Sequence, residues 1–112
     1  MRRVIFALAA VALSTPSFAA DKKIERLWKA KCASCHGKEG KGDTEKGQKM
    51  KVPDFTSAEF QQKKSDEDIK KQITNGVKAE KDGVKKEMDA FGDEIKGETL
   101  DQVVAYIRSL KQ

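Results

Sequence analysis

The chain has 112 residues, a formal net charge of +5, and 37% charged against 38% hydrophobic residues, a size typical of one domain with a modest core. Most of its cations are lysines, and beyond the first three residues only Arg26 and Arg108 offer the guanidinium groups that suit phosphates and base edges. The composition therefore argues against a nucleic-acid partner.

The N-terminus has the pattern of a secretory signal peptide. Arg2-Arg3 precedes a nearly uninterrupted apolar run over residues 4–13, and Ser17-Phe18-Ala19 places small residues where a signal peptidase cleaves. The run of about ten residues is well short of the roughly 20 needed to span a bilayer. We expect cleavage after Ala19; an uncleaved anchor is the alternative.

Cleavage would define two segments, a removable signal peptide over residues 1–19 and a single domain over residues 20–112. The mature side chains would then sum to +3, because two arginines are removed. No second long apolar run remains, so we expect a soluble, periplasmic protein without permanent membrane insertion.

The first expected helix covers residues 22–33. Asp21 is a plausible N-cap, and Ile24, Leu27 and Trp28 recur at helical spacing on one face. This apolar stripe leads directly into the most informative motif of the chain.

That motif is Cys32-Ala33-Ser34-Cys35-His36, which holds the only cysteines and the only histidine. C-x-x-C-H is the pattern of covalent c-type haem attachment. Cys32 and Cys35 would bond to the two vinyl groups of one haem c, and His36 would be the proximal iron ligand. Its imidazole must be neutral to bind, and its other ring nitrogen needs a partner.

Three other interpretations of the motif compete with haem. A thioredoxin-like redox site should lie between a strand and a helix, and no apolar β-run precedes Cys32. A zinc site normally takes four Cys or His ligands, and the chain has three. A structural disulfide would leave His36 unexplained.

Between the motif and the next helix, residues 37–51 are rich in glycine and charge without apolar periodicity, which predicts a surface loop ending near Met50. Residues 57–63 favour a short helix, with Phe55 and Phe60 as inward-facing anchors.

The third helix is expected to begin after Ser65 and to end at Asn75-Gly76 with a left-handed cap, with Ile69, Ile73 and Val77 as its buried stripe. Residues 77–93 are predicted to be a lysine-rich loop.

The last helix should open with a capping box at Thr99-x-x-Gln102 and run to Leu110. Because no alternating strand pattern is present, we predict an all-α fold with about four helices around one haem.

Because the sequence has no other histidine, the second axial position of the iron would be filled by a methionine or a lysine, or would stay open. Met88 lies between two predicted helices, whereas Met50 lies in a polar loop. We favour Met88; the alternative for either methionine is that it fills a gap in the core.

The chain resembles the class I cytochrome c family, specifically small bacterial periplasmic monohaem members. The resemblance covers nearly all of the mature sequence. It is carried by Leu27-Trp28, Cys32-Ala33-Ser34-Cys35-His36-Gly37, the stretch from Gly83 to Met88, Phe91, and Val104-Ala105-Tyr106-Ile107-Arg108-Ser109-Leu110.

The resemblance implies that the first and last helices cross and that haem lies in a crevice with one edge exposed. It implies that Met88 is the distal ligand and that the carbonyl of Pro53 accepts the N–H of His36. Two departures stand out: Ile24 occupies a position often held by glycine, and Asp89 follows the methionine where proline is usual.

We therefore predict a non-enzymatic, monomeric single-electron carrier of a respiratory chain, exchanging electrons with larger redox proteins. Lysines near the haem edge could steer an acidic partner. The alternatives are a five-coordinate haem protein that binds small gaseous ligands and, less favoured, a thiol oxidoreductase that uses Cys32 and Cys35.

Overall fold

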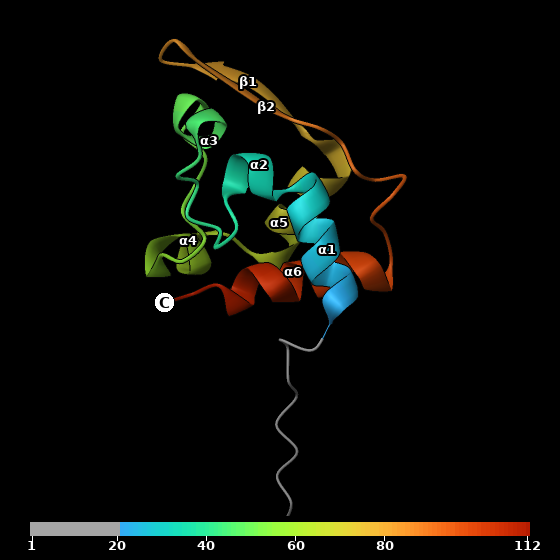
Figure 1. Ribbon diagram of the computed structural model, residues 1–112. Helices are drawn as coiled ribbons and strands as arrows, with labels where there is room; N and C mark the ends of the chain where they lie inside the picture. The colour runs from blue at the N-terminus through green and yellow to red at the C-terminus, as the bar shows by residue number, and fades with distance from the viewer. Residues whose placement is uncertain (1–20) are drawn as a thin grey trace, which may run out of the picture.

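The computed structural model describes residues 21–112; the predicted signal peptide lies outside this range (Figure 1). Within it, six helices and one two-stranded antiparallel sheet follow in the order α1 Lys22–Lys31, α2 Ala33–His36, α3 Glu45–Met50, α4 Ala58–Lys63, α5 Asp66–Asn75, β1 Val77–Lys81, β2 Val84–Met88 and α6 Glu98–Ser109. The predicted helical fold is confirmed, but the all-α description with about four helices is wrong in detail.

The predicted first helix divides into two at Cys32. Asp21 caps α1, its carboxylate accepting from the backbone N–H of Lys23 at 3.1 Å and of Ile24 at 3.4 Å. The Cys32 N–H closes α1 on the Trp28 carbonyl at 2.9 Å, and α2 continues the chain to His36. The motif is therefore held on a short helix joined to a well-capped one.

The predicted loop over residues 37–51 contains the short helix α3. Thr44 caps it by accepting from the Gly47 N–H at 3.0 Å, and the Thr44 hydroxyl donates to the Cys35 carbonyl at 3.0 Å. The helix has a single buried residue, Gly47, so it shows no apolar periodicity in the sequence.

The predicted extents of α4 and α5 are confirmed, but Val77, which was expected in the buried stripe of α5, begins β1 and is half-buried. The Ser57 hydroxyl caps α4, and Ser65 forms a capping box with Asp68 at the start of α5. The expected left-handed cap after α5 differs in detail, because Gly76 combines φ +73° with an extended ψ of −177°.

The predicted loop over residues 77–93 contains the hairpin β1–β2. Asp82 and Gly83 form its two-residue turn with φ of +54° and +77°, as type I′ turns require. Val77 pairs with Met88 at the open end of the hairpin. The hairpin lies beside α3 and on the opposite side of the molecule from α6 (Figure 1).

Helix α6 begins at Glu98 with Gly97 as N-cap and no side-chain capping bond, so the predicted Thr99–Gln102 capping box is absent. Helix α6 packs against α1 and α5, in agreement with the expected pairing of the first and last helices. Ile24 is only 3% exposed and lies in the core despite its size. The core consists of Ile24, Trp28, Cys32, Phe55, Phe60, Ile69, Ile73, Ile95, Val103, Val104 and Ile107. Over residues 21–112, no helix has the length and apolarity needed to cross a membrane.

Candidate haem site

A cavity of about 570 Å³ lies where α1, α2, α3, α5 and the hairpin meet, within the range of ligand pockets. It brings together every site residue expected from the sequence: Cys32, Cys35, His36, Met50 and Met88. Apolar side chains complete much of its wall, namely Trp28, Phe55, Phe60, Ile69, Ile73, Val77, Phe91, Ile95, Val103 and Ile107. The thiols, the imidazole and the thioethers of the predicted site therefore line one mostly apolar cavity.

The imidazole of His36 is held between aromatic rings. It stacks on Phe55, with ring centroids 4.7 Å apart and an interplanar angle of 21°, and the Trp28 ring centroid lies 6.1 Å away. Burial lowers the pKa of His36 to about 4. The imidazole is therefore neutral at physiological pH, as a metal ligand must be.

The Nδ1 atom of His36 is buried and has no hydrogen-bond partner among residues 21–112. The bond to the Pro53 carbonyl that the family resemblance implies is thus not formed, although Pro53 lines the same cavity. A buried, unpaired ring nitrogen costs free energy unless a bound group or water satisfies it.

Trp28 fixes the end of the motif. Its indole N–H donates to the Gly37 carbonyl at 2.9 Å inside the core, and the side chain is only 2% exposed. Gly37 has φ +82°, which lets the chain turn away directly after His36. The orientation of His36 therefore depends on a residue one helix earlier.

The two cysteines are free thiols on the cavity wall. Burial raises the pKa of the Cys32 thiol to about 11. Redox-active cysteines have lowered pKa values, because the thiolate is the attacking species. The environment of Cys32 therefore disfavours the thiol oxidoreductase interpretation.

The two candidate methionines reach the cavity from different elements. Met88 ends β2 and packs against the core cluster, whereas Met50 ends α3 and is not among the side chains packed against that cluster. Both side chains are half-buried. Both methionines therefore lie on the cavity wall, and of the two only Met88 also contacts the core cluster.

The hairpin also contributes to the wall, where Val77 and Lys86 join Met88; this contribution was not predicted from the sequence. The dipeptide Asp82-Gly83 was the available signal, because Asp-Gly is a strong marker of a two-residue hairpin turn.

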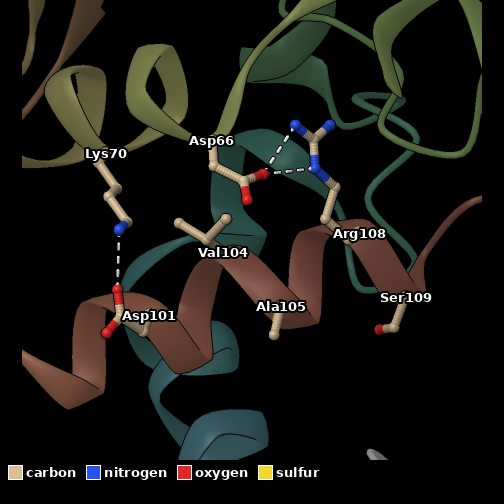
Figure 2. Close-up of a pocket in the computed structure, with 7 residues that line it drawn as sticks. All are labelled: Asp66, Lys70, Asp101, Val104, Ala105, Arg108 and Ser109. Carbon is tan, nitrogen blue, oxygen red and sulfur yellow. Dashed lines mark hydrogen bonds and ion pairs between the residues drawn. The ribbon is translucent and has the colours of Figure 1, made fainter. Parts of the chain in front are cut away.

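A second groove of about 580 Å³ lies between α5 and α6 (Figure 2). It contains the ion pairs Lys70–Asp101 and Arg108–Asp66, both at 2.9 Å. No predicted site residue lines this groove, and its charged groups already pair with one another.

The cavity lined by Cys32, Cys35 and His36 fits a haem. It offers two thiols for attachment, a neutral imidazole and two thioethers, within a mostly apolar wall. No group of three or more His, Cys, Asp and Glu side chains in the described part of the chain could hold a bare metal ion.

Comparison with known proteins agrees with this chemistry. Residues 19–107 match the family described as "Cytochrome C oxidase, cbb3-type, subunit III". The solved structure of the KustC0563 c-type cytochrome is 30% identical, with a TM-score of 0.65 over 79% of this chain and 96% of that one. The structure of a Kustc0563 mutant is also 30% identical, with a TM-score of 0.63 over 79% and 98% of the two chains. No curated protein matched the sequence. The chain therefore belongs to this family of c-type cytochromes, and its cofactor is a covalently bound haem c.

Proposed function

We propose that the protein is a single-electron carrier in which Cys32 and Cys35 tether the haem and His36 and Met88 are its axial ligands. The bound haem supplies a one-electron couple between ferrous and ferric iron. The observation that carries this proposal is that both thiols, the imidazole and the thioether of Met88 line one cavity.

The protein side chains would favour electron transfer by holding the ligands in place. Phe55 stacks on His36, and the Met88 side chain rests against the core. Ligands fixed in both oxidation states need little rearrangement when charge changes, which is the advantage of a preorganised site.

The attachment is tested by expressing the mature protein in a host that attaches haem and recording its intact mass and visible spectrum. We expect the mass of one haem, no free thiol after denaturation and reduction, and a low-spin ferrous spectrum. A colourless protein from a host that attaches haem to a control cytochrome would instead support thiol chemistry at Cys32 and Cys35.

The axial ligand is tested with the variants Met88→Leu and Met50→Leu. Leucine keeps the apolar volume of methionine and removes the sulfur. We expect only Met88→Leu to lose the weak long-wavelength ferric band of sulfur-ligated iron. High-spin haem in the unsubstituted protein, with rapid binding of carbon monoxide, would favour the alternative of a five-coordinate gas-binding protein.

We further propose that the carrier acts in the periplasm and meets its redox partners at the cavity opening. Five lysines contribute to the cavity lining, Lys31, Lys46, Lys51, Lys64 and Lys86, against two acidic residues, Glu87 and Asp89. An acidic partner would be attracted to such a surface at a rate that falls as salt rises.

This steering is tested by electron-transfer rates with an acidic and a basic redox protein across ionic strength. Lys51→Gln and Lys64→Gln should slow the reaction with the acidic partner. The matched control Lys23→Gln, on an exposed residue of α1 that does not line the cavity, should have a smaller effect. Equal effects of all three would contradict a docking site at the cavity.

A further inference from the structure

The C-terminal end of α5 binds the backbone of the segment that carries the proposed distal ligand. We call residues 88–92 the distal segment. The last carbonyls of a helix have no partner within it. Here the Ile73 carbonyl accepts from the Phe91 N–H at 2.8 Å, and the Thr74 carbonyl accepts from the Gly92 N–H at 3.2 Å. The distal segment thus supplies hydrogen-bond donors to two of the last carbonyls of α5.

Gly76, directly after α5, allows a still closer approach. Its φ of +73° and ψ of −177° fall in a region that is essentially restricted to glycine. A Cβ atom at this position would lie 2.6 Å from the Met88 carbonyl oxygen and 2.9 Å from the Ala90 nitrogen. Both are backbone atoms, so no side-chain rotation could relieve the contact.

A second glycine makes the complementary contact from the distal segment. A Cβ atom on Gly92 would lie 2.9 Å from the Thr74 carbonyl oxygen and 3.0 Å from its methyl group, and Gly92 has no positive φ. The residue after Gly76 is Val77, which pairs in register with Met88. The same junction therefore fixes Met88 through close packing and through strand pairing.

We propose that Gly76 and Gly92 are positioning residues that set how far Met88 extends into the cavity. This inference rests on the proposed role of Met88 as the distal ligand. An added methyl group at either glycine would move the backbone of the distal segment away from α5, and the thioether would move with it.

The test uses the ferric holoprotein and the variants Gly76→Ala, Gly92→Ala and Gly83→Ala. Gly83 is the matched control. It lies in the turn of the hairpin that carries Met88, it has a φ of +77° like that of Gly76, and a Cβ atom there would meet nothing within 4 Å. Two quantities are measured, the long-wavelength ferric band of sulfur-ligated iron and the Kd of imidazole, which competes with the sixth ligand. Far-UV circular dichroism checks that each variant is folded.

We expect Gly76→Ala and Gly92→Ala to weaken the ferric band and to bind imidazole about tenfold more tightly, because the methionine-bound state becomes less populated. Gly83→Ala should match the unsubstituted protein in both measurements. If Gly76→Ala does not fold, Gly92→Ala decides the question, since it adds no strain from a positive φ.

The proposal is overturned if the folded glycine variants keep the band and the imidazole Kd of the unsubstituted protein. It is also overturned if Gly83→Ala changes the band and the imidazole Kd as much as Gly76→Ala and Gly92→Ala do. The variant Met88→Leu distinguishes a failure of the positioning role from a failure of the ligand assignment. If Met88→Leu loses the band while Gly76→Ala and Gly92→Ala keep it, only the positioning role is refuted. If Met88→Leu keeps the band, the ligand assignment itself is wrong, and the positioning role is refuted with it.

Discussion

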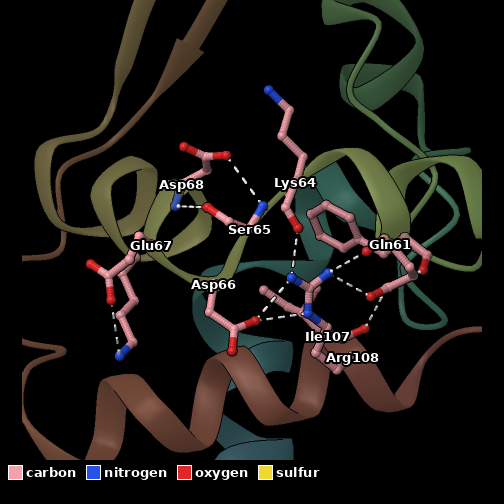
Figure 3. Close-up of polar contacts among 10 residues, drawn as sticks. Gln61, Lys64, Ser65, Asp66, Glu67, Asp68, Ile107 and Arg108 are labelled. Carbon is pink, nitrogen blue, oxygen red and sulfur yellow. Dashed lines mark hydrogen bonds and ion pairs between the residues drawn. The ribbon is translucent and has the colours of Figure 1, made fainter.

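Arg108 connects α6 to the end of α4 and the start of α5 (Figure 3). Its guanidinium donates to the Gln61 carbonyl at 3.1 Å, to the Gln61 side-chain oxygen at 2.9 Å and to the Lys64 carbonyl at 2.6 Å. It also pairs with Asp66 at 2.9 Å. One side chain thus satisfies carbonyls that lie more than 40 residues earlier in the sequence.

We predict that Arg108→Met destabilises the protein by about 2–3 kcal/mol. Each of the two bonds to main-chain carbonyls contributes about 1 kcal/mol net. The pair with Asp66 adds less than about 1 kcal/mol, because that carboxylate is 63% exposed. A loss of this size corresponds to a drop in Tm of roughly 10–20 °C for a domain of this length.

The assay is denaturant unfolding of the ferric holoprotein followed by far-UV circular dichroism. Arg26→Met is the matched control, because Arg26 is exposed and its side chain makes no hydrogen bond or ion pair with residues 21–112. Asp66→Asn should cost less than about 1 kcal/mol and lose its effect in high salt. The reasoning is refuted if Arg108→Met and Arg26→Met differ by less than about 0.5 kcal/mol.

Three further outcomes are expected from local contacts. Trp28→Phe should cost about 1 kcal/mol in urea unfolding, because it removes the indole bond to the buried Gly37 carbonyl and leaves that carbonyl only the longer bond from the Gly40 N–H at 3.2 Å; an unchanged midpoint would contradict the role of the indole bond. Ser65→Ala should lower the free energy of unfolding by about 1 kcal/mol through loss of the cap on α5, and Ser65→Thr should retain most of it. The Ser65 backbone N–H and then its hydroxyl hold the pKa of Asp68 below its usual value of 3.8, so this carboxylate stabilises the fold above that pH and loses its effect as pH falls through the lowered pKa. Asp68→Asn should therefore be less stable than the unsubstituted protein at pH 7, with a difference that shrinks below pH 3.8; a constant difference at all pH values would contradict this.

Elements defined by local signals could be predicted from the sequence. Asp21, Ser57 and Ser65 each cap the helix they precede, because a short polar side chain can accept from the first free N–H groups. The apolar stripe of α1, including Ile24 and Trp28, is buried as its spacing predicts.

The hairpin was missed because its inward-facing positions do not look apolar. Along β2, Val84, Lys86 and Met88 are half-buried and the residues between them are exposed. A lysine at the middle position hides the alternation, since its aliphatic stem can lie against the protein while its ammonium group reaches water. Helix α3 was missed because it is held by Thr44 and by a close backbone approach at Gly47 rather than by an apolar face.

The two sides of the candidate site differ in how they are encoded. Cys32, Cys35 and His36 are adjacent in sequence, so one short helix suffices to bring them together. The position of Met88 instead depends on the hairpin register and on the contact between Gly76 and the distal segment. A sequence pattern can therefore identify the residues that attach the haem. The position of Met88 depends on tertiary contacts, which the spacing of residues in the sequence does not specify. It follows that substitutions at the glycines of the α5 junction should alter axial ligation while leaving covalent attachment intact, which intact mass and the ferric spectrum measure separately.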